Sequence, residues 1–162
     1  MDTIYLETSI VSHASARPST DPHVLVLQQQ ARDWWVIERP KFIVVTSQLV
    51  LDEALLGDPI AAAERMTLLA GIPLVPIDGR VEAVADELIS RSLMPPKAKL
   101  DALHVAAAAA VGGVQFLLTQ NCRHIANAHT LPRIYRTLAE LGFPNLLNYT
   151  PAEFLGNTDD DT

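Results

Sequence analysis

Short apolar runs of strand length recur along the chain, and segments rich in helix-forming residues separate them. The runs predict five strands, at Ile4–Leu6, Phe42–Val45, Pro73–Ile77, Gln115–Leu118 and Asn145–Leu147. The segments between them predict helices at Pro22–Glu38, Gln48–Leu56, Pro59–Ala70, Arg80–Arg91, Lys99–Val111 and Pro132–Leu141. Because strands alternate with helices, the pattern favours an α/β fold with a mostly parallel sheet of about five strands, covered by helices on both faces.

The residues at the ends of these helices have the chemistry that helix ends require. Ser47 and Asp58 stand where N-caps belong. Gly57, Gly71 and Gly142 stand where a glycine commonly ends a helix. These positions support the predicted helix boundaries.

Composition places the chain among globular proteins of one domain. It has 162 residues, of which 49% are hydrophobic and 19% charged, so it has enough apolar side chains to form a core. We expect a single domain over residues 1–156 and a disordered acidic tail at 157–162. The single cysteine, Cys122, excludes an internal disulfide and a Cys-rich zinc module, and it is compatible with a reducing cytoplasm.

Neither a secretory signal nor a membrane span is predicted. The sequence begins MDTIYLETSI and has no basic region followed by a long apolar run. The longest apolar stretch, Ala102–Leu118, contains His104 and is interrupted by Gly112 and Gly113, which indicates a buried helix followed by a strand. We therefore expect a cytoplasmic protein without membrane contact.

The acidic charge limits how the protein could bind nucleic acid. The formal net charge is −7, and about −4 without the three aspartates of the tail. Nonspecific affinity for nucleic acid comes from Lys and Arg side chains that displace counterions from phosphates. A nucleic-acid substrate would therefore require a local contact, a metal ion or a partner protein.

Polar residues collect at one predicted edge of the sheet. Glu7 directly follows the first strand, and Thr119 and Asn121 follow the fourth. Glu53 lies on the helix after the second strand, and Asp101 lies in the first turn of the helix that leads into the fourth. In parallel α/β sheets the chemistry gathers outside the carboxyl ends of the strands. Clustered carboxylates without thiols suit Mg²⁺ or Mn²⁺, which can orient a nucleophile and stabilise charge on a phosphate.

Four segments together resemble the PIN-domain ribonucleases, and within them the VapC-type toxins of bacterial toxin–antitoxin pairs. The segments are YLETS (5–9), SQLVLDEALLG (47–57), LDALHVAAAAAVGGVQFLLT (100–119) and TQNCRHIAN (119–127). The resemblance extends from about Thr3 to about Leu155 and depends on the order and spacing of these segments, since no single one is specific.

The resemblance implies a PIN-like three-layer α/β/α sandwich and a metal-dependent endoribonuclease that hydrolyses RNA phosphodiester bonds. It implies an antitoxin protein as partner, and we also expect a homodimer. The implied catalytic residues are Glu7, Glu53, Asp101 and Asn121; the first three would hold Mg²⁺ or Mn²⁺, and Ser9 and Thr119 would support them. Weaker candidates for contact with RNA phosphates are the basic residues that flank the acids: Lys97, Lys99, Arg123 and His124.

The chain departs from the family pattern at two positions. The family usually has Asp where this chain has Glu7, which keeps the charge and lengthens the side chain by one methylene. It usually has Asp where this chain has Asn121, which removes a charge but keeps a carbonyl oxygen. The second departure makes a one-metal site easier to form than a two-metal site.

Each candidate acid also has a purely structural interpretation. Glu7 could be a helix N-terminal acid favoured by the helix dipole, and Asp101 could be an ordinary acid of a first helical turn. Asn121 could be a turn residue, because Asn tolerates left-handed backbone. Asp52 remains a substitute for Glu53, although the family spacing selects Glu53.

Other chemically active side chains have alternative interpretations too. His104, one turn after Asp101, is either a core histidine or a ligand. Cys122 and His124 are a formal thiol–imidazole pair, but neighbouring side chains of this kind seldom face each other. Trp34 and Trp35 could stack on RNA bases or pack between a helix and the sheet or another subunit.

Two rival functions remain open at this stage. A catalytically weakened PIN-like module that binds RNA or a protein partner is suggested by Asn121. A flavodoxin-like ligand-binding or signalling domain is the other, but the first strand is followed by Glu7-Thr8-Ser9 instead of a Gly-rich phosphate-binding loop.

Overall fold

The computed structural model describes residues 1–156; the predicted acidic tail at 157–162 lies outside the described residues. The described chain forms a five-stranded sheet with strand order β3-β2-β1-β4-β5, in which all neighbouring strands are parallel. The strands are β1 (Thr3–Leu6), β2 (Ile43–Ser47), β3 (Leu74–Val75), β4 (Phe116–Leu118) and β5 (Leu147–Tyr149). The predicted parallel α/β fold is confirmed.

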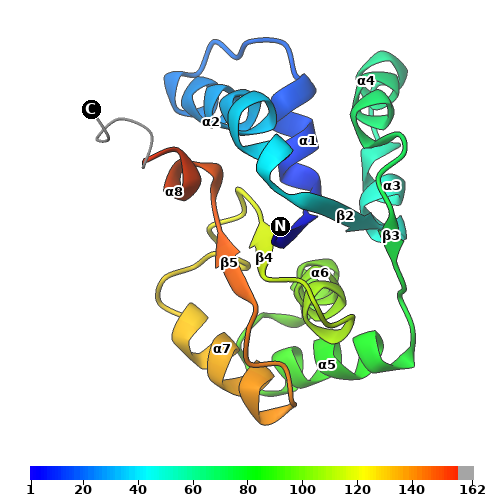
Figure 1. Cartoon of the computed structure of the whole chain (residues 1–162), viewed down its shortest axis with the longest axis vertical. Helices are drawn as coiled ribbons and strands as arrows, with labels where there is room; N and C mark the ends of the chain where they lie inside the picture. The colour runs from blue at the N-terminus through cyan, green and yellow to red at the C-terminus, as the bar shows by residue number, and fades with distance from the viewer. Residues whose placement is uncertain (157–162) are drawn as a thin grey trace.

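Helices cover both faces of the sheet and make three layers (Figure 1). The helices α1 to α4 lie on one side, and α5 to α7 lie on the other. In chain order the α-helices are α1 (Thr8–Ser15), α2 (Pro22–Asp33), α3 (Gln48–Ala54), α4 (Pro59–Leu69), α5 (Gly79–Ser90), α6 (Lys99–Ala110), α7 (Leu131–Glu140) and α8 (Pro151–Leu155). A π-helical turn at Trp34–Glu38 and short 3₁₀ turns at Arg39–Lys41 and Pro96–Ala98 complete the described elements.

Two helices were not predicted, and one strand is displaced. Helix α1 has the sequence TSIVSHAS, whose serines and β-branched residues have weak helix propensity. Capping by Glu7 and burial of Ile10 and Val11 stabilise it instead. Helix α8 has only five residues, and β5 begins two residues later than the run that predicted it.

Helix α6 is the most deeply buried helix among the described residues. All of Ala102–Ala110 is buried, and a helix that is apolar on every side belongs inside a protein. The two glycines after α6 have positive φ angles near 75° and turn the chain into β4. The prediction of a buried helix followed by a strand is confirmed. No helix in the described part of the chain is long and apolar enough to cross a membrane.

The tryptophan pair packs against the sheet. Trp34 is fully buried and stacks on Phe42 with ring centroids 6.2 Å apart. Trp35 is half-buried, and the Arg39 guanidinium lies 4.7 Å from its ring centroid. The helix-on-sheet interpretation therefore accounts for Trp34, whose ring is unavailable for stacking on a base.

The strand order creates a switch point between β1 and β4. The chain runs from β1 outward through β2 to β3, and then returns to the other side of β1 with β4 and β5. At the carboxyl edge the Glu7 amide donates to the Leu118 carbonyl at 3.1 Å. Ligands of open parallel sheets bind outside such a switch point, and the residues that follow β1 and β4 meet there.

Candidate functional site

Glu7 is a buried carboxylate held by three donors. Its side chain is at the N-cap of α1, and Oε2 accepts hydrogen bonds from the Ser9 amide at 3.1 Å, from the Ser9 hydroxyl, and from the Thr119 hydroxyl at 2.8 Å. Only 5% of the residue is exposed. A carboxylate removed from water needs such partners, so the supporting contacts predicted for Ser9 and Thr119 are present, and Glu7 is also the N-terminal acid of a helix.

Glu53 points toward the interior from α3. Its Oε1 accepts from the Thr8 hydroxyl at 3.2 Å and lies 2.5 Å from His104 Nε2. The neighbouring Asp52 is exposed and pairs with Gln48 on the surface. The choice of Glu53 over Asp52 agrees with this placement.

His104 is fully buried and connects Glu53 to Tyr5. Its Nδ1 lies 2.8 Å from the Tyr5 hydroxyl, which in turn lies 2.7 Å from the Ser47 hydroxyl. Burial, followed by the nearby charges of Glu7 and Glu53, raises the pKa of Tyr5 far above its ordinary value, although the Ser47 hydrogen bond partly opposes this rise. Tyr5 therefore stays neutral. Ser47 occupies the predicted N-cap position of α3, but its hydroxyl contacts Tyr5 and not the helix amides.

Asp101 is paired with a histidine from another segment. It lies in the first turn of α6, and its Oδ2 is 2.8 Å from His124 Nδ1. About a fifth of each side chain is exposed, 24% for Asp101 and 19% for His124. The His124 ring is thus engaged with Asp101, and within residues 1–156 no hydrogen bond joins it to Cys122.

Asn121 closes the turn that follows β4. Its Oδ1 accepts from the Arg123 amide at 3.2 Å and from the His124 amide at 3.0 Å, and its own amide donates to the Thr119 hydroxyl at 2.9 Å. This is the turn role that Asn commonly takes. The structure places Asn121 beside the acidic residues, with its carbonyl oxygen already bound to backbone amides.

Hydrogen bonds and one helical turn join these residues into a closed circuit. We call this ring of contacts the carboxylate circuit. In order around the ring, its members are Glu7, Thr119, Asn121, His124, Asp101, His104, Glu53 and Thr8. Asp101 and His104 are one turn apart on α6, and Thr8 is next to Glu7 in the chain. Four separate segments of the chain thus fix one another at the switch point.

The donor chemistry of the circuit suits a hard cation. In each of the three acids one carboxylate oxygen is bound by protein donors, while Glu7 Oε1, Glu53 Oε2 and Asp101 Oδ1 have no hydrogen-bond partner within residues 1–156. Mg²⁺ and Mn²⁺ prefer oxygen ligands that are oriented in this way by further hydrogen bonds. As they stand, no three His, Cys, Asp or Glu side chains of the described chain form a group that could hold a metal ion.

The basic residues predicted to contact RNA phosphates differ in whether acids of this chain already bind them. Lys97 and Arg123 are exposed, and neither forms an ion pair within residues 1–156. Lys99 instead pairs with Asp86 and Glu82 of α5; the hydrogen bond to Asp86 and these charges raise the pKa of Lys99. Lys99 is therefore bound to acids of this chain, whereas the other two cations are available to an anion.

Cys122 does not have the environment of a nucleophile. It is an exposed free cysteine, and partial burial together with the charge of Glu153 raises the pKa of its thiol. A reactive cysteine needs the opposite shift, toward thiolate.

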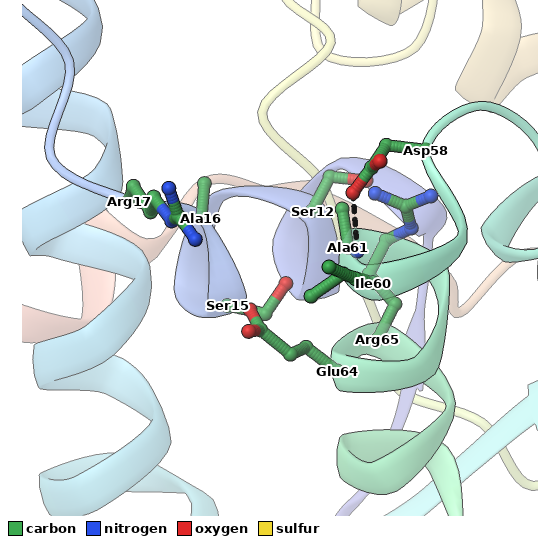
Figure 2. Close-up of a pocket in the computed structure, with 9 residues that line it drawn as sticks. All are labelled: Ser12, Ser15, Ala16, Arg17, Asp58, Ile60, Ala61, Glu64 and Arg65. Carbon is green, nitrogen blue, oxygen red and sulfur yellow. Dashed lines mark hydrogen bonds between the residues drawn. The ribbon is translucent and has the colours of Figure 1, made fainter.

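A groove of about 460 Å³ lies between α1 and α4. Figure 2 shows Arg17 and Ala16 toward one end, and Asp58 and Arg65 toward the other. Arg65 donates to the Ala54 and Leu56 carbonyls at the end of α3, and Asp58 caps α4 as predicted, accepting from the Ala61 amide at 3.0 Å. None of the predicted site residues lines this groove.

The sequence did not indicate Tyr5, Thr8 or Ser47 as members of the site. Each is a polar residue at the carboxyl end of a buried strand or at the start of the next helix, and that position is the signal that could have identified them. For His104 the signal was its spacing of one helical turn from Asp101 on an otherwise apolar helix.

Comparison with protein-family models, with characterised proteins and with solved structures gave no match for this chain.

Proposed function

We propose that this protein is a metal-dependent endoribonuclease of the PIN type, acting as the toxin of a toxin–antitoxin pair. The observation that carries the proposal is the carboxylate circuit, in which three acids from distant segments are fixed at the switch point of a parallel sheet. These acids are oriented by hydroxyl and imidazole groups, and each keeps one oxygen without a partner within residues 1–156.

Each member of the proposed site has a distinct task. Glu7, Glu53 and Asp101 would hold Mg²⁺ or Mn²⁺ through their free oxygens. When bound, such an ion activates water as a nucleophile and stabilises charge on the scissile phosphate. Ser9 and Thr119 hold Glu7 in place through hydrogen bonds and so preserve the orientation of this proposed ligand.

Because the protein is acidic overall, we expect it to bind RNA through a few cations beside the site and not through a broad basic surface. Lys97 and Arg123 are exposed cations on the segments that carry Asp101 and Asn121, and they are suited to bind RNA phosphates beside the scissile bond. An antitoxin protein and a second copy of the chain are the further partners that we propose. A small antitoxin-type coding region beside this gene would support the toxin role, and its absence would favour a general nuclease.

One observation favours a second candidate, a catalytically weakened PIN-like module that binds RNA or a protein. Asn121 stands where a fourth acid would add charge, and its carbonyl oxygen is used by the turn. Without that charge the site holds a cation less strongly. This candidate keeps the same surface and partners but predicts little or no cleavage.

Incubation with RNA distinguishes the two candidates. Purified protein is mixed with total bacterial RNA in Mg²⁺ or Mn²⁺, and discrete fragments are expected that disappear with EDTA. Glu7→Gln should abolish cleavage, while Asp52→Asn, which changes an exposed acid on the neighbouring face of α3, should leave it unchanged. Binding of RNA without cleavage would favour the weakened module, and cleavage that survives EDTA would contradict the metal-dependent mechanism.

A further inference from the structure

Tyr5 and His104 form a buried polar pair within the core of the protein. His104 is 0% exposed and lies on α6 among buried alanine and valine side chains. The Tyr5 side chain comes from the central strand β1 and is also 0% exposed. Burying polar groups is costly unless each is hydrogen-bonded. Apolar side chains would fill this part of the core at lower cost. The hydrogen bonds of the pair therefore indicate a role beyond packing.

The contacts of the pair run in one direction, toward Glu53. The Glu53 carboxylate can only accept, so His104 Nε2 carries the proton in the 2.5 Å contact with Oε1. In a neutral imidazole Nδ1 then accepts, and its partner at 2.8 Å is the Tyr5 hydroxyl, which can donate. The Tyr5 hydrogen is then used in that contact, so Ser47 donates to the Tyr5 oxygen at 2.7 Å. The order of donors is Ser47, Tyr5, His104 and Glu53.

We propose that His104 is a positioning residue for Glu53, and that Tyr5 fixes the imidazole tautomer that this role requires. His104 Nε2 and the Thr8 hydroxyl hold Glu53 Oε1 from two sides, which leaves Oε2 in one orientation. His104 does not touch the cation or the substrate; it acts through Glu53. The inference rests on the proposed function, because the orientation of Glu53 matters to the reaction only if Glu53 is a metal ligand.

Variants of the pair separate a positioning role from a merely structural one. His104→Leu and Tyr5→Phe should each weaken Mn²⁺ binding about tenfold, in line with the cost of losing a residue that orients a metal ligand. His104→Gln should keep the affinity within about threefold, because its amide NH₂ can donate to Glu53 and its carbonyl can accept from Tyr5. Rescue by Gln but not by Leu would not follow from lost packing alone.

A matched control comes from the neighbouring strand. Thr46 is fully buried on β2, and its hydroxyl donates to the Leu6 carbonyl at 2.9 Å without touching a carboxylate. Like Tyr5→Phe, Thr46→Val removes one buried hydroxyl. It should lower the melting temperature while leaving Mn²⁺ affinity unchanged. Equal losses of affinity in Tyr5→Phe and Thr46→Val would overturn the inference.

Two further measurements separate failure of this inference from failure of the proposed function. Mn²⁺ titration of the wild-type protein and of Glu53→Gln tests the metal site itself, and absence of a difference between them would overturn both. If Glu53→Gln binds Mn²⁺ more weakly than the wild type while His104→Leu and Tyr5→Phe bind it as tightly as the wild type, this inference is overturned and the proposed metal site is not. Long-range ¹H–¹⁵N NMR of the metal-free protein, with the His104 signal assigned by its loss in His104→Gln, should show the Nε2-protonated tautomer. The Nδ1-protonated tautomer would contradict the proposed order of donors.

Discussion

The Thr119 hydroxyl donates to the Glu7 carboxylate across 2.8 Å, although the two residues are 112 positions apart in the chain. Each directly follows a central strand, Glu7 after β1 and Thr119 after β4. Register between these parallel strands pairs Leu6 with Leu118, so the next residue of each strand is brought to the same level. The contact is therefore a direct consequence of strand pairing at the switch point.

Removal of that hydroxyl should destabilise the protein. In Thr119→Val the buried Glu7 carboxylate loses one charge-assisted hydrogen bond, and the Asn121 amide loses its acceptor. We expect the free energy of unfolding to fall by about 1.5–3 kcal/mol, measured by urea denaturation. Thr119→Ser keeps the hydroxyl, loses only the methyl group and should recover most of the loss. Equal destabilisation by both variants would mean that the loss in Thr119→Val cannot be assigned to the hydroxyl.

The fold could be predicted from the sequence because each strand is a compact apolar run bounded by polar, Gly or Pro residues. The three acids Glu7, Glu53 and Asp101 belong to one hydrogen-bonded circuit near the carboxyl edge, which agrees with their predicted positions after strands or on the adjoining helices. What could not be predicted is the partner of each carboxylate. Whether His124 points toward Asp101 or toward solvent depends on the turn at Asn121, and sequence spacing does not determine side-chain direction in such a turn.

The interior of the site was harder to predict for a related reason. From the sequence, Tyr5 is expected to be an ordinary apolar residue of a buried strand, and Ser47 is expected to be an N-cap. Register between β1 and β2 pairs Tyr5 with Val45, and the long Tyr5 side chain reaches the Ser47 hydroxyl two residues further along β2. Pairing between distant strands decides that contact, and no local pattern in either strand indicates it.

Asp101→Asn should weaken Mn²⁺ binding at least tenfold in calorimetric titration. The substitution keeps the shape of the side chain and removes the negative charge that attracts the ion. Asp52→Asn removes the same charge from an exposed residue that pairs with Gln48, and it should change the affinity by less than about twofold if long-range attraction is screened. Similar losses in both variants would show that general acidity, rather than a site, binds the ion.

Stability at high pH should depend on Tyr5. Burial and the nearby Glu7 and Glu53 charges raise the pKa of its hydroxyl in the folded protein, whereas an unfolded tyrosine ionises near pH 10. Above about pH 10 the unfolded state therefore releases a proton that the folded state keeps, and stability falls as pH rises, by up to about 1.4 kcal/mol per pH unit. Urea denaturation between pH 9 and pH 11 should show a steeper decline for the wild type than for Tyr5→Phe. Parallel declines would contradict the raised pKa.

Asn121→Asp tests whether position 121, in the turn after β4, belongs to the proposed metal site. One carboxylate oxygen of the new side chain can still accept from the Arg123 and His124 amides, as Asn121 Oδ1 does. The second oxygen replaces an NH₂ group that has no partner within residues 1–156, so the turn should persist and the free energy of unfolding should change little.

An added carboxylate in the same circuit as Glu7 and Asp101 should attract a cation, and we expect Mn²⁺ to bind about tenfold more tightly in Asn121→Asp than in the wild type. Mn²⁺ affinity and RNA cleavage rate are measured in parallel for Asn121→Asp and the wild type, and together they distinguish three roles for position 121. Tighter binding with faster cleavage would identify the amide as the cause of a weakened site. Tighter binding with lost cleavage would indicate that the neutral amide helps to place the attacking water. Unchanged affinity would mean that Asn121 serves the turn alone, which would exclude position 121 from the metal site.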